Sequence, residues 1–192
     1  TGGADCRLRI WPLTFHDFLL EAHHETALCS VAVSSDGRKL AVGTESGTLG
    51  VLDVSGQGYK TVLRSHVGSI LSVASRPPHG FEFATVGKDR TIRVWDTIKA
   101  QQRFEFKSPT DDPLCIAYHP GNLVDEQRVE AHEIIVGFKS GMLRILDVTT
   151  TASKFELQHH NAAIKKILFD PIALLKFLRK KYYLLFLDEK IF

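Results

Sequence analysis

One twelve-residue pattern occurs four times along this chain at nearly constant spacing. Its fullest copy reads T-V-G-K-D-R-T-I-R-V-W-D and spans residues 85–96. The other copies span residues 1–12, 42–53 and 136–147. Each copy has an aromatic residue or leucine at its eleventh position: Trp11, Leu52, Trp95 and Leu146. These anchors are 41, 43 and 51 residues apart. Such a period indicates repeated supersecondary units that must stack to bury their apolar faces.

A second set of residues repeats in register with the first. A histidine, replaced once by proline, precedes a short apolar segment in each unit: His24, His66, Pro109 and His160. Their intervals of 42, 43 and 51 residues follow those of the first set. A period of about 40 to 45 residues with a histidine and a closing W-D or L-D is typical of WD repeats. The two sets together predict a β-propeller.

We therefore expect an all-β WD-repeat β-propeller fragment, with about three to four antiparallel four-stranded blades in an open ring. The repeats divide the chain into the end of a truncated blade (1–11), blades at 12–54, 55–97 and 98–148, the start of a further blade (149–171) and an atypical tail (172–192). Because the chain begins without Met inside a repeat, we expect a fragment of something longer. In the second repeat we expect an outer strand at 59–64 before three inner strands at 70–74, 82–86 and 91–95.

Two segments depart from the repeat. Residues 121–132 lengthen the third repeat, and their charge and lack of period favour an exposed loop, with a binding loop as the alternative. After Pro171 the repeat pattern stops. Residues 172–192 are compatible with a helix or with two strands, because short apolar runs do not decide between them. The cations at 179–181 suggest an anionic partner, whereas the plainer interpretation is translated non-coding or alternatively spliced sequence.

Composition narrows the classes of function. The chain has 192 residues, of which 44% are hydrophobic and 24% charged, as in ordinary globular proteins. A net charge of +2 gives no reason to expect a nucleic-acid or membrane surface. Cys6, Cys29 and Cys115 form neither a disulfide framework nor a zinc pattern, which favours reduced thiols and a cytoplasmic protein. No pattern predicts a metal, a cofactor or a small-molecule substrate.

The second repeat alone carries a complete polar set: His66, Thr85, Asp89 and Trp95. We expect Asp89 to accept from the imidazole and from turn amides, His66 to donate to Thr85, and Thr85 to accept from the indole. The truncated first repeat keeps part of the set in Thr1, Asp5 and Trp11, and the other two blades have Ser46 with Leu52 and Ser140 with Leu146. A catalytic interpretation, in which Asp orients His and His activates a hydroxyl, is the alternative. The polar set recurs in the other repeats with some of its members replaced, and this recurrence favours a structural network over a catalytic site.

The residues just before the turn aspartate are candidates for a partner surface. They are Ala4, Glu45, Lys88 and Lys139, and they are expected near the rim where propellers commonly bind partners. Their mixed charge favours a protein partner over a polyanion. A solvated rim without a partner is the alternative.

The amino-acid sequence of the repeats also resembles that of one family of WD-repeat proteins, which is associated with centrioles and cilia. The resemblance lies in residues 9–25, 46–54, 64–73 and 106–120, including the proline after Trp11 and the S-P in place of the third histidine. It implies a long protein of tandem propellers with a microtubule-binding region elsewhere, located at the centriole or basal body and acting in cilium assembly. Its expected partners are a centriolar scaffold or tubulin. The alternatives are a generic WD-repeat adaptor, such as a ubiquitin-ligase substrate receptor, and a propeller-based enzyme.

Overall fold

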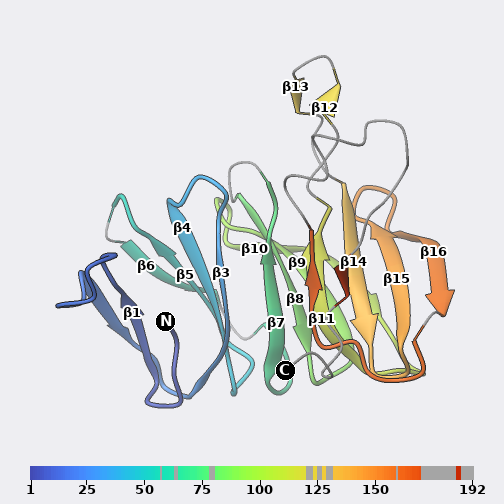
Figure 1. The fold of residues 1–192 in the computed structure, drawn as a ribbon, viewed down its shortest axis with the longest axis horizontal. Coiled ribbons are helices and arrows are strands. Elements are labelled where there is room, and N and C mark those ends of the chain that lie inside the picture. Colours follow the sequence, from blue (N-terminus) through green and yellow to red (C-terminus); the bar gives the residue numbers. More distant parts are fainter. Residues whose placement is uncertain are drawn as a thin grey trace.

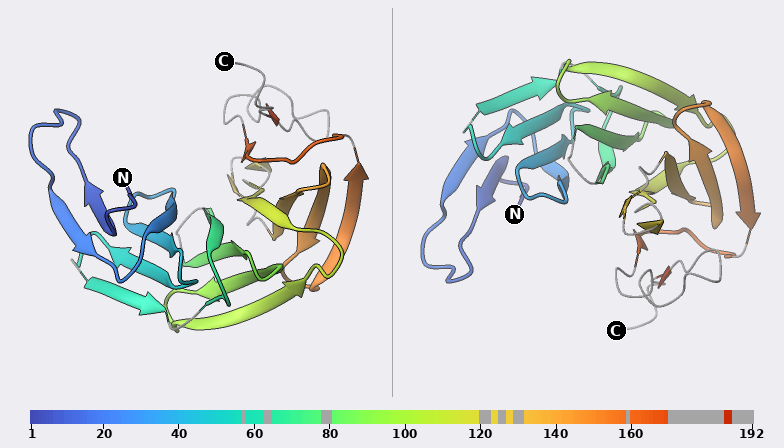
Figure 2. Two further views of the ribbon diagram at one scale, coloured as in Figure 1. Left: turned by 90° about the horizontal axis from the view of Figure 1, so that it is seen from below. Right: turned by 90° about the horizontal axis from the view of Figure 1, so that it is seen from above.

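The computed structural model describes residues 1–56, 58–62, 65–77, 81–119, 123–124, 127–128, 132–158, 160–169 and 185–186. These residues form antiparallel strands, and no helix occurs among them. The sheets stand side by side in an open arc that follows the order of the chain from the N-terminal strands to the third blade (Figures 1 and 2). The expected all-β open propeller is confirmed.

Three sheets have four strands each, and successive strands are neighbours except around an inserted hairpin. The first sheet contains β3 (Leu28–Val33), β4 (Lys39–Thr44), β5 (Leu49–Asp53) and β6 (Gly58–Val62). The second contains β7 (Ile70–Ser75), β8 (Glu82–Gly87), β9 (Thr91–Asp96) and β10 (Gln101–Lys107). The third contains β11 (Pro113–Tyr118), β14 (Glu133–Phe138), β15 (Met142–Asp147) and β16 (Ala152–Gln158). These sheets are the first, second and third blades below.

Three two-stranded sheets complete the part of the chain that the structure describes. β1 (Arg7–Ile10) pairs with β2 (Leu20–His23) before the first blade. β12 (Leu123–Val124) and β13 (Gln127–Arg128) form a hairpin inside the expected insertion at 121–132, most of which lies outside the described residues. β17 (Ile167–Leu168) pairs with β18 (Leu185–Phe186). Apart from β18, the tail at 172–192 lies outside the described residues, so the choice between helix and strands there stays a prediction.

The expected order of strands within a blade is wrong. The strand expected to open the second blade forms as β6, but it pairs with β5 as the last strand of the first blade. The reason is the aspartate that closes the repeat motif, which folds the chain straight back. Asp53 Oδ1 accepts from the Ser55 and Gly56 amides at 3.0 and 3.1 Å. Asp96 and Asp147 build the same turn in the next two blades. Blades therefore span 28–62, 70–107 and 113–158 instead of 12–54, 55–97 and 98–148.

The core lies between blades. Each apolar cluster joins two neighbouring sheets, so a blade has an N-side face toward the preceding blade and a C-side face toward the following one. Between the first and second blades, Leu49 and Val51 of β5 pack in one cluster with Phe83 and Trp95. Because both faces of a blade are packed, the strands carry long runs of buried residues, and β8 is buried along its whole length. No blade can bury its apolar surface alone.

Candidate interaction surface and its supporting network

The structure brings the four polar residues of the second repeat into one chain of contacts. His66 Nδ1 lies 2.9 Å from Asp89 Oδ1, and its Nε2 lies 2.7 Å from Thr85 Oγ1. The Trp95 indole N–H donates to the same Thr85 oxygen at 2.9 Å. The set therefore connects the segment before β7 to β8, the β8–β9 turn and β9.

The close approach of His66 to Asp89 depends on a glycine beside them. Gly87 ends β8, and a Cβ at this position would lie 2.2 Å from His66 Nδ1 and 2.5 Å from Asp89 Oδ1. Any side chain there would push the imidazole away from the turn. The glycine in the repeat motif is thus required by the approach of His66 to the strand.

Protonation follows from the surroundings. Although burial raises the pKa of Asp89, hydrogen bonds from His66, the Val67 amide and Thr91 outweigh it and hold that pKa below its ordinary value. The ionised carboxylate only accepts, so His66 Nδ1 carries the proton. Burial lowers the pKa of His66, and the neutral ring then has an acceptor at Nε2.

The direction of one hydrogen bond differs from the expectation. Since Nε2 of a neutral His66 is an acceptor, the Thr85 hydroxyl donates to it and accepts from Trp95. The expectation that His66 donates to Thr85 would require a charged ring or the other tautomer. The hydroxyl is thus occupied in both of its roles and is fully buried at 0% exposure, without access to a substrate. This geometry supports the structural interpretation over the catalytic one.

The incomplete copies of this polar set, before the first blade and in the first and third blades, make other contacts. Trp11 donates to Thr1 Oγ1 at 2.9 Å, as Trp95 does to Thr85, while Asp5 contacts Arg9 at 2.8 Å and the Arg7 amide. In the first blade Ser46 joins a cluster of hydroxyls with Thr26 and Thr44 at 3.0 and 3.1 Å. In the third blade Ser140 donates to Asp111 at 2.5 Å. Each blade thus ties its second hairpin turn to the segment before its first strand, by different chemistry.

Sequence reasoning missed two contributors. Thr91 donates to Asp89 Oδ1 at 2.8 Å and lies 3.0 Å from His66 Nδ1. Glu82, only 4% exposed, accepts from Arg103 at 2.6 Å and from the Tyr118 hydroxyl of the third blade at 2.9 Å. A signal existed for Glu82, because the first residue of the second strand is charged in all three blades: Lys39, Glu82 and Glu133.

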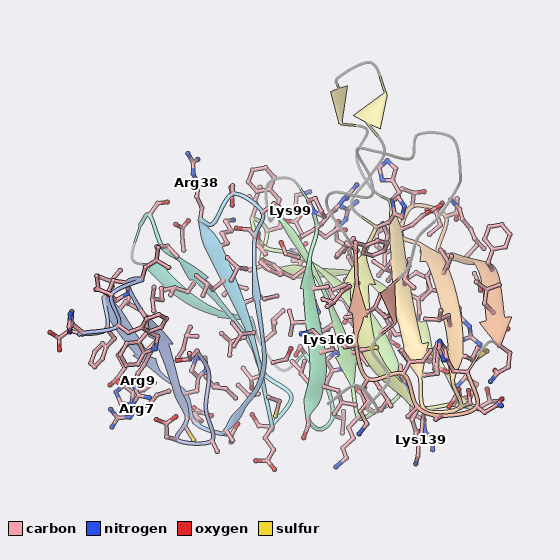
Figure 3. All side chains as sticks on the ribbon, in the orientation of Figure 1. Arg7, Arg9, Arg38, Lys99, Lys139 and Lys166 are labelled. Atoms are coloured by element: carbon pink, nitrogen blue, oxygen red, sulfur yellow. The ribbon has the colours of Figure 1, made fainter. Side chains whose placement is uncertain are left out.

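The expected partner residues lie at equivalent turns and are exposed. Glu45, Lys88 and Lys139 follow the second strand of successive blades, and their backbone amides donate to Ala27, Ser69 and Asp112 carbonyls at 2.9, 2.8 and 2.9 Å. Ala4, before β1, is also exposed. Figure 3 shows Lys139 on one rim of the arc, opposite Arg38 and Lys99 on the other. We call Glu45, Lys88 and Lys139 the turn rim.

Other chemistry has little support within the part of the chain that the structure describes. No group of three or more His, Cys, Asp or Glu side chains there is placed to hold a metal ion. No helix among these residues has the length and apolar character needed to cross a membrane. Polar side chains do come together in the network around His66 and in the cluster of Glu82 with Arg103 and Tyr118.

These features define a class. The family described as "WD domain, G-beta repeat" matches residues 16–53 and 58–96, and the sheet topology extends the arrangement through a third blade. The chain is a WD-repeat protein with an open β-propeller fold.

Individual relatives match this chain over most of its length. The chain is 40% identical over 171 residues to WD repeat-containing protein 90 of Xenopus tropicalis, and 35% identical over 170 residues to the Homo sapiens protein of that name. It is 44% identical over 171 residues to centriole proteome protein 16 of Chlamydomonas reinhardtii. These matches cover 89%, 88% and 89% of this chain but only 9%, 9% and 8% of the relatives. The chain therefore spans less than a tenth of their length.

Proposed function

We propose that this chain is a non-enzymatic interaction scaffold in a centriole-associated protein, and that it binds a protein partner through the turn rim. The observation that carries the proposal is the repeated presentation of exposed side chains on anchored turns, each fixed by a backbone hydrogen bond to the segment before its blade. Rigid presentation lowers the entropy lost on binding. The name of the Chlamydomonas relative supports the centriolar setting.

The charges of the turn rim fit a protein better than a polyanion. Lys88 and Lys139 alternate with carboxylates, since Asp112 contacts Arg90 at 2.7 Å and Lys139 at 3.6 Å, and Glu45 lies at the equivalent turn of the first blade. A phosphate backbone favours an uninterrupted group of cations, which this pattern lacks, whereas mixed charge suits the polar part of a protein interface. Within this proposal a role in cilium assembly follows from the centriolar setting, with a centriolar scaffold or tubulin as the partner.

The test is a charge reversal confined to the turn rim. A triple variant with Glu45→Lys, Lys88→Glu and Lys139→Glu should remain folded, because these side chains are exposed, yet should lose enrichment at centrioles when tagged and expressed in ciliated cells. Lys99→Glu on the opposite rim is the matched control and should keep the wild-type distribution (Figure 3). Unchanged enrichment of a folded triple variant would overturn the rim assignment. A wild-type chain that never concentrates at centrioles would overturn the setting itself.

A further inference from the structure

The segment before the second blade passes between two turns of the turn rim. The His66 amide donates to the Gly47 carbonyl, in the turn of the first blade, at 2.9 Å. The next amide, that of Val67, donates to Asp89 Oδ2, in the turn of the second blade, at 2.9 Å. A Cβ on Gly47 would lie 2.3 Å from the His66 carbonyl oxygen, so the first of these turns is packed directly on the segment. Val67 is therefore held at a fixed position between the two turns.

Val67 is the apolar member of an otherwise polar set. The residue after the histidine or proline of the repeat is polar and exposed in the other three units, where it is Glu25, Thr110 and Asn161. Val67 is 85% exposed. The contact that fixes its position comes from its backbone amide, which any residue except proline would supply. Its side chain thus adds little to the packing of the blades and is accessible to a partner.

Two opposite charges flank Val67. Glu45 and Lys88 are the exposed residues of the turns on either side of it. Within the part of the chain that the structure describes, neither of them forms an ion pair. Charges placed in this way decide which partners fit a surface more than how tightly they bind. We call Glu45, Val67 and Lys88 the first junction.

The next junction along the turn rim, between the second and third blades, differs in both respects. Its charges already contact one another, since Asp112 lies 2.7 Å from Arg90 and 3.6 Å from Lys139. The position equivalent to Val67 is Thr110, so the apolar side chain is replaced by a polar one. A partner would have to replace existing ion pairs there, whereas at the first junction it adds new ones.

We propose that the first junction is the selective part of the turn rim, and that it binds an extended protein segment in which an apolar side chain lies between a basic and an acidic one. The base lies opposite Glu45, the apolar side chain on Val67 and the acid opposite Lys88. A segment of uniform charge is disfavoured, because one of its ends would meet a like charge. This inference rests on the proposed function, since it names the chemistry of the partner at the same surface.

Binding of short synthetic peptides to the full chain, followed by fluorescence anisotropy, tests the charge pattern. Each peptide has a leucine at its centre and one charged residue on each side, at a range of spacings. The three peptide classes carry an acid and a base, two acids, or two bases. The wild type should bind the acid-and-base class most tightly. A peptide offers the same charges in either direction, so this comparison does not depend on the orientation in which it binds.

Single charge reversals should change the preferred class. Glu45→Lys leaves two cations at the first junction and should favour the two-acid class, whereas Lys88→Glu leaves two anions and should favour the two-base class. Each reversal should lower the affinity for the acid-and-base class by about threefold or more, because one exposed charge pair changes from attraction to repulsion. Val67→Ser should weaken binding of all three classes and leave their order unchanged.

Two lysine-to-glutamate variants outside the first junction are matched controls. Lys139→Glu lies on the turn rim and Lys99→Glu on the opposite rim, and both should keep the preference of the wild type (Figure 3). All the substituted side chains are exposed, so far-ultraviolet circular dichroism should be unchanged in every variant. A wild type that binds none of the classes or binds them equally would overturn the inference. So would a Lys139→Glu variant whose preference changes as that of Lys88→Glu does.

The peptide experiment and the centriolar experiment fail separately. Loss of centriolar enrichment in the triple rim variant, together with no peptide preference in the wild type, would contradict the first junction and leave the proposed function standing. The expected peptide preference, together with a wild type that never concentrates at centrioles, would contradict the proposed setting and leave the first junction standing.

Discussion

The first and second blades have the same strand order but differ in how their turns are held. In the second blade the turn after β8 is tied to the preceding segment by a charged and buried set, Asp89 with His66 and Thr85. In the first blade the same position is Ser46, exposed among other hydroxyls. Both turns keep the same backbone hydrogen bond, from Lys88 to Ser69 and from Glu45 to Ala27. The fold therefore depends on the hairpin geometry, and the polar set adds stability to it.

The difference also extends to the neighbouring core. Trp95 uses its indole N–H within the set and its ring in the cluster shared with the first blade, while Leu52 fills the equivalent place by packing alone. A tryptophan buried here needs a polar partner, and a leucine does not. This coupling explains why the motif weakens as a unit, losing the aspartate and the tryptophan together in the first and third blades.

The largest effect is expected for Asp89→Ala. The change removes the acceptor of His66 and of the Val67 and Thr91 amides, so the buried donors of His66 and Thr91 lose that partner. Loss of such a charge-assisted acceptor should lower the free energy of unfolding by about 3 kcal/mol. The midpoint of urea denaturation, compared with wild type, measures it.

A smaller loss is expected for Thr85→Val, which keeps the volume of the side chain. The indole N–H of Trp95 and Nε2 of His66 would lose their shared partner, while Asp89 would keep its contacts with the turn. The expected decrease is about 2 kcal/mol, and near-ultraviolet circular dichroism should report the changed tryptophan environment. A variant as stable as wild type, with an unchanged indole signal, would show that the hydroxyl is not shared as described.

Ser46→Ala in the first blade is the matched comparison and should cost less than about 1 kcal/mol. Ser46 is exposed, Thr26 can turn to water when the Ser46 hydroxyl is removed, and the buried Thr44 keeps its hydrogen bond to the Thr48 carbonyl at 3.1 Å. The same urea titration applies. Equal shifts for Ser46→Ala and Asp89→Ala would contradict the difference between the two blades.

Sequence reasoning found the parts of this comparison that repeat along the chain. The period and the two sets of anchors were enough for the propeller class and for bringing His66, Thr85, Asp89 and Trp95 together. It failed to assign a strand near a repeat boundary to the right blade, because such a strand can pair with the blade before it or with the blade after it. The turn built by Asp53 decided that pairing.

Sequence reasoning also failed to predict the role of a charged residue in a strand. Glu82 looks like any charged residue at a strand end, and its partners Arg103 and Tyr118 lie on strands far along the sequence. Only the three-dimensional arrangement shows that its carboxylate connects the second blade to the third. Its recurrence as Lys39 and Glu133 was visible but had no chemistry attached to it.

The smallest effect is expected from pH and again separates the two blades. Burial lowers the pKa of His66 below its ordinary value of 6.5, so the folded chain holds the ring neutral where the unfolded chain takes up a proton. The stabilisation is then complete above about pH 6.5 and is lost progressively as the pH falls below that value. Comparing denaturation midpoints at about pH 8 and about pH 5.5 should show a loss for the wild type that is smaller for His66→Gln.

The test compares how stability changes with pH in the two chains. Stability at a single pH does not serve, because His66→Gln lowers stability at every pH by disturbing the network. His24 and His119 also have lowered pKa values through burial, but they contribute equally to both chains and cancel in the difference. Asp89 titrates at lower pH than this window, since its pKa lies below its ordinary 3.8. Parallel slopes for the two chains would mean that the pKa of His66 does not change on folding, and a loss that is larger for His66→Gln than for the wild type would mean that His66 is charged in the folded state. In that case Thr85 would accept from the ring, and the direction of hydrogen bonding in the second blade would have to be reversed.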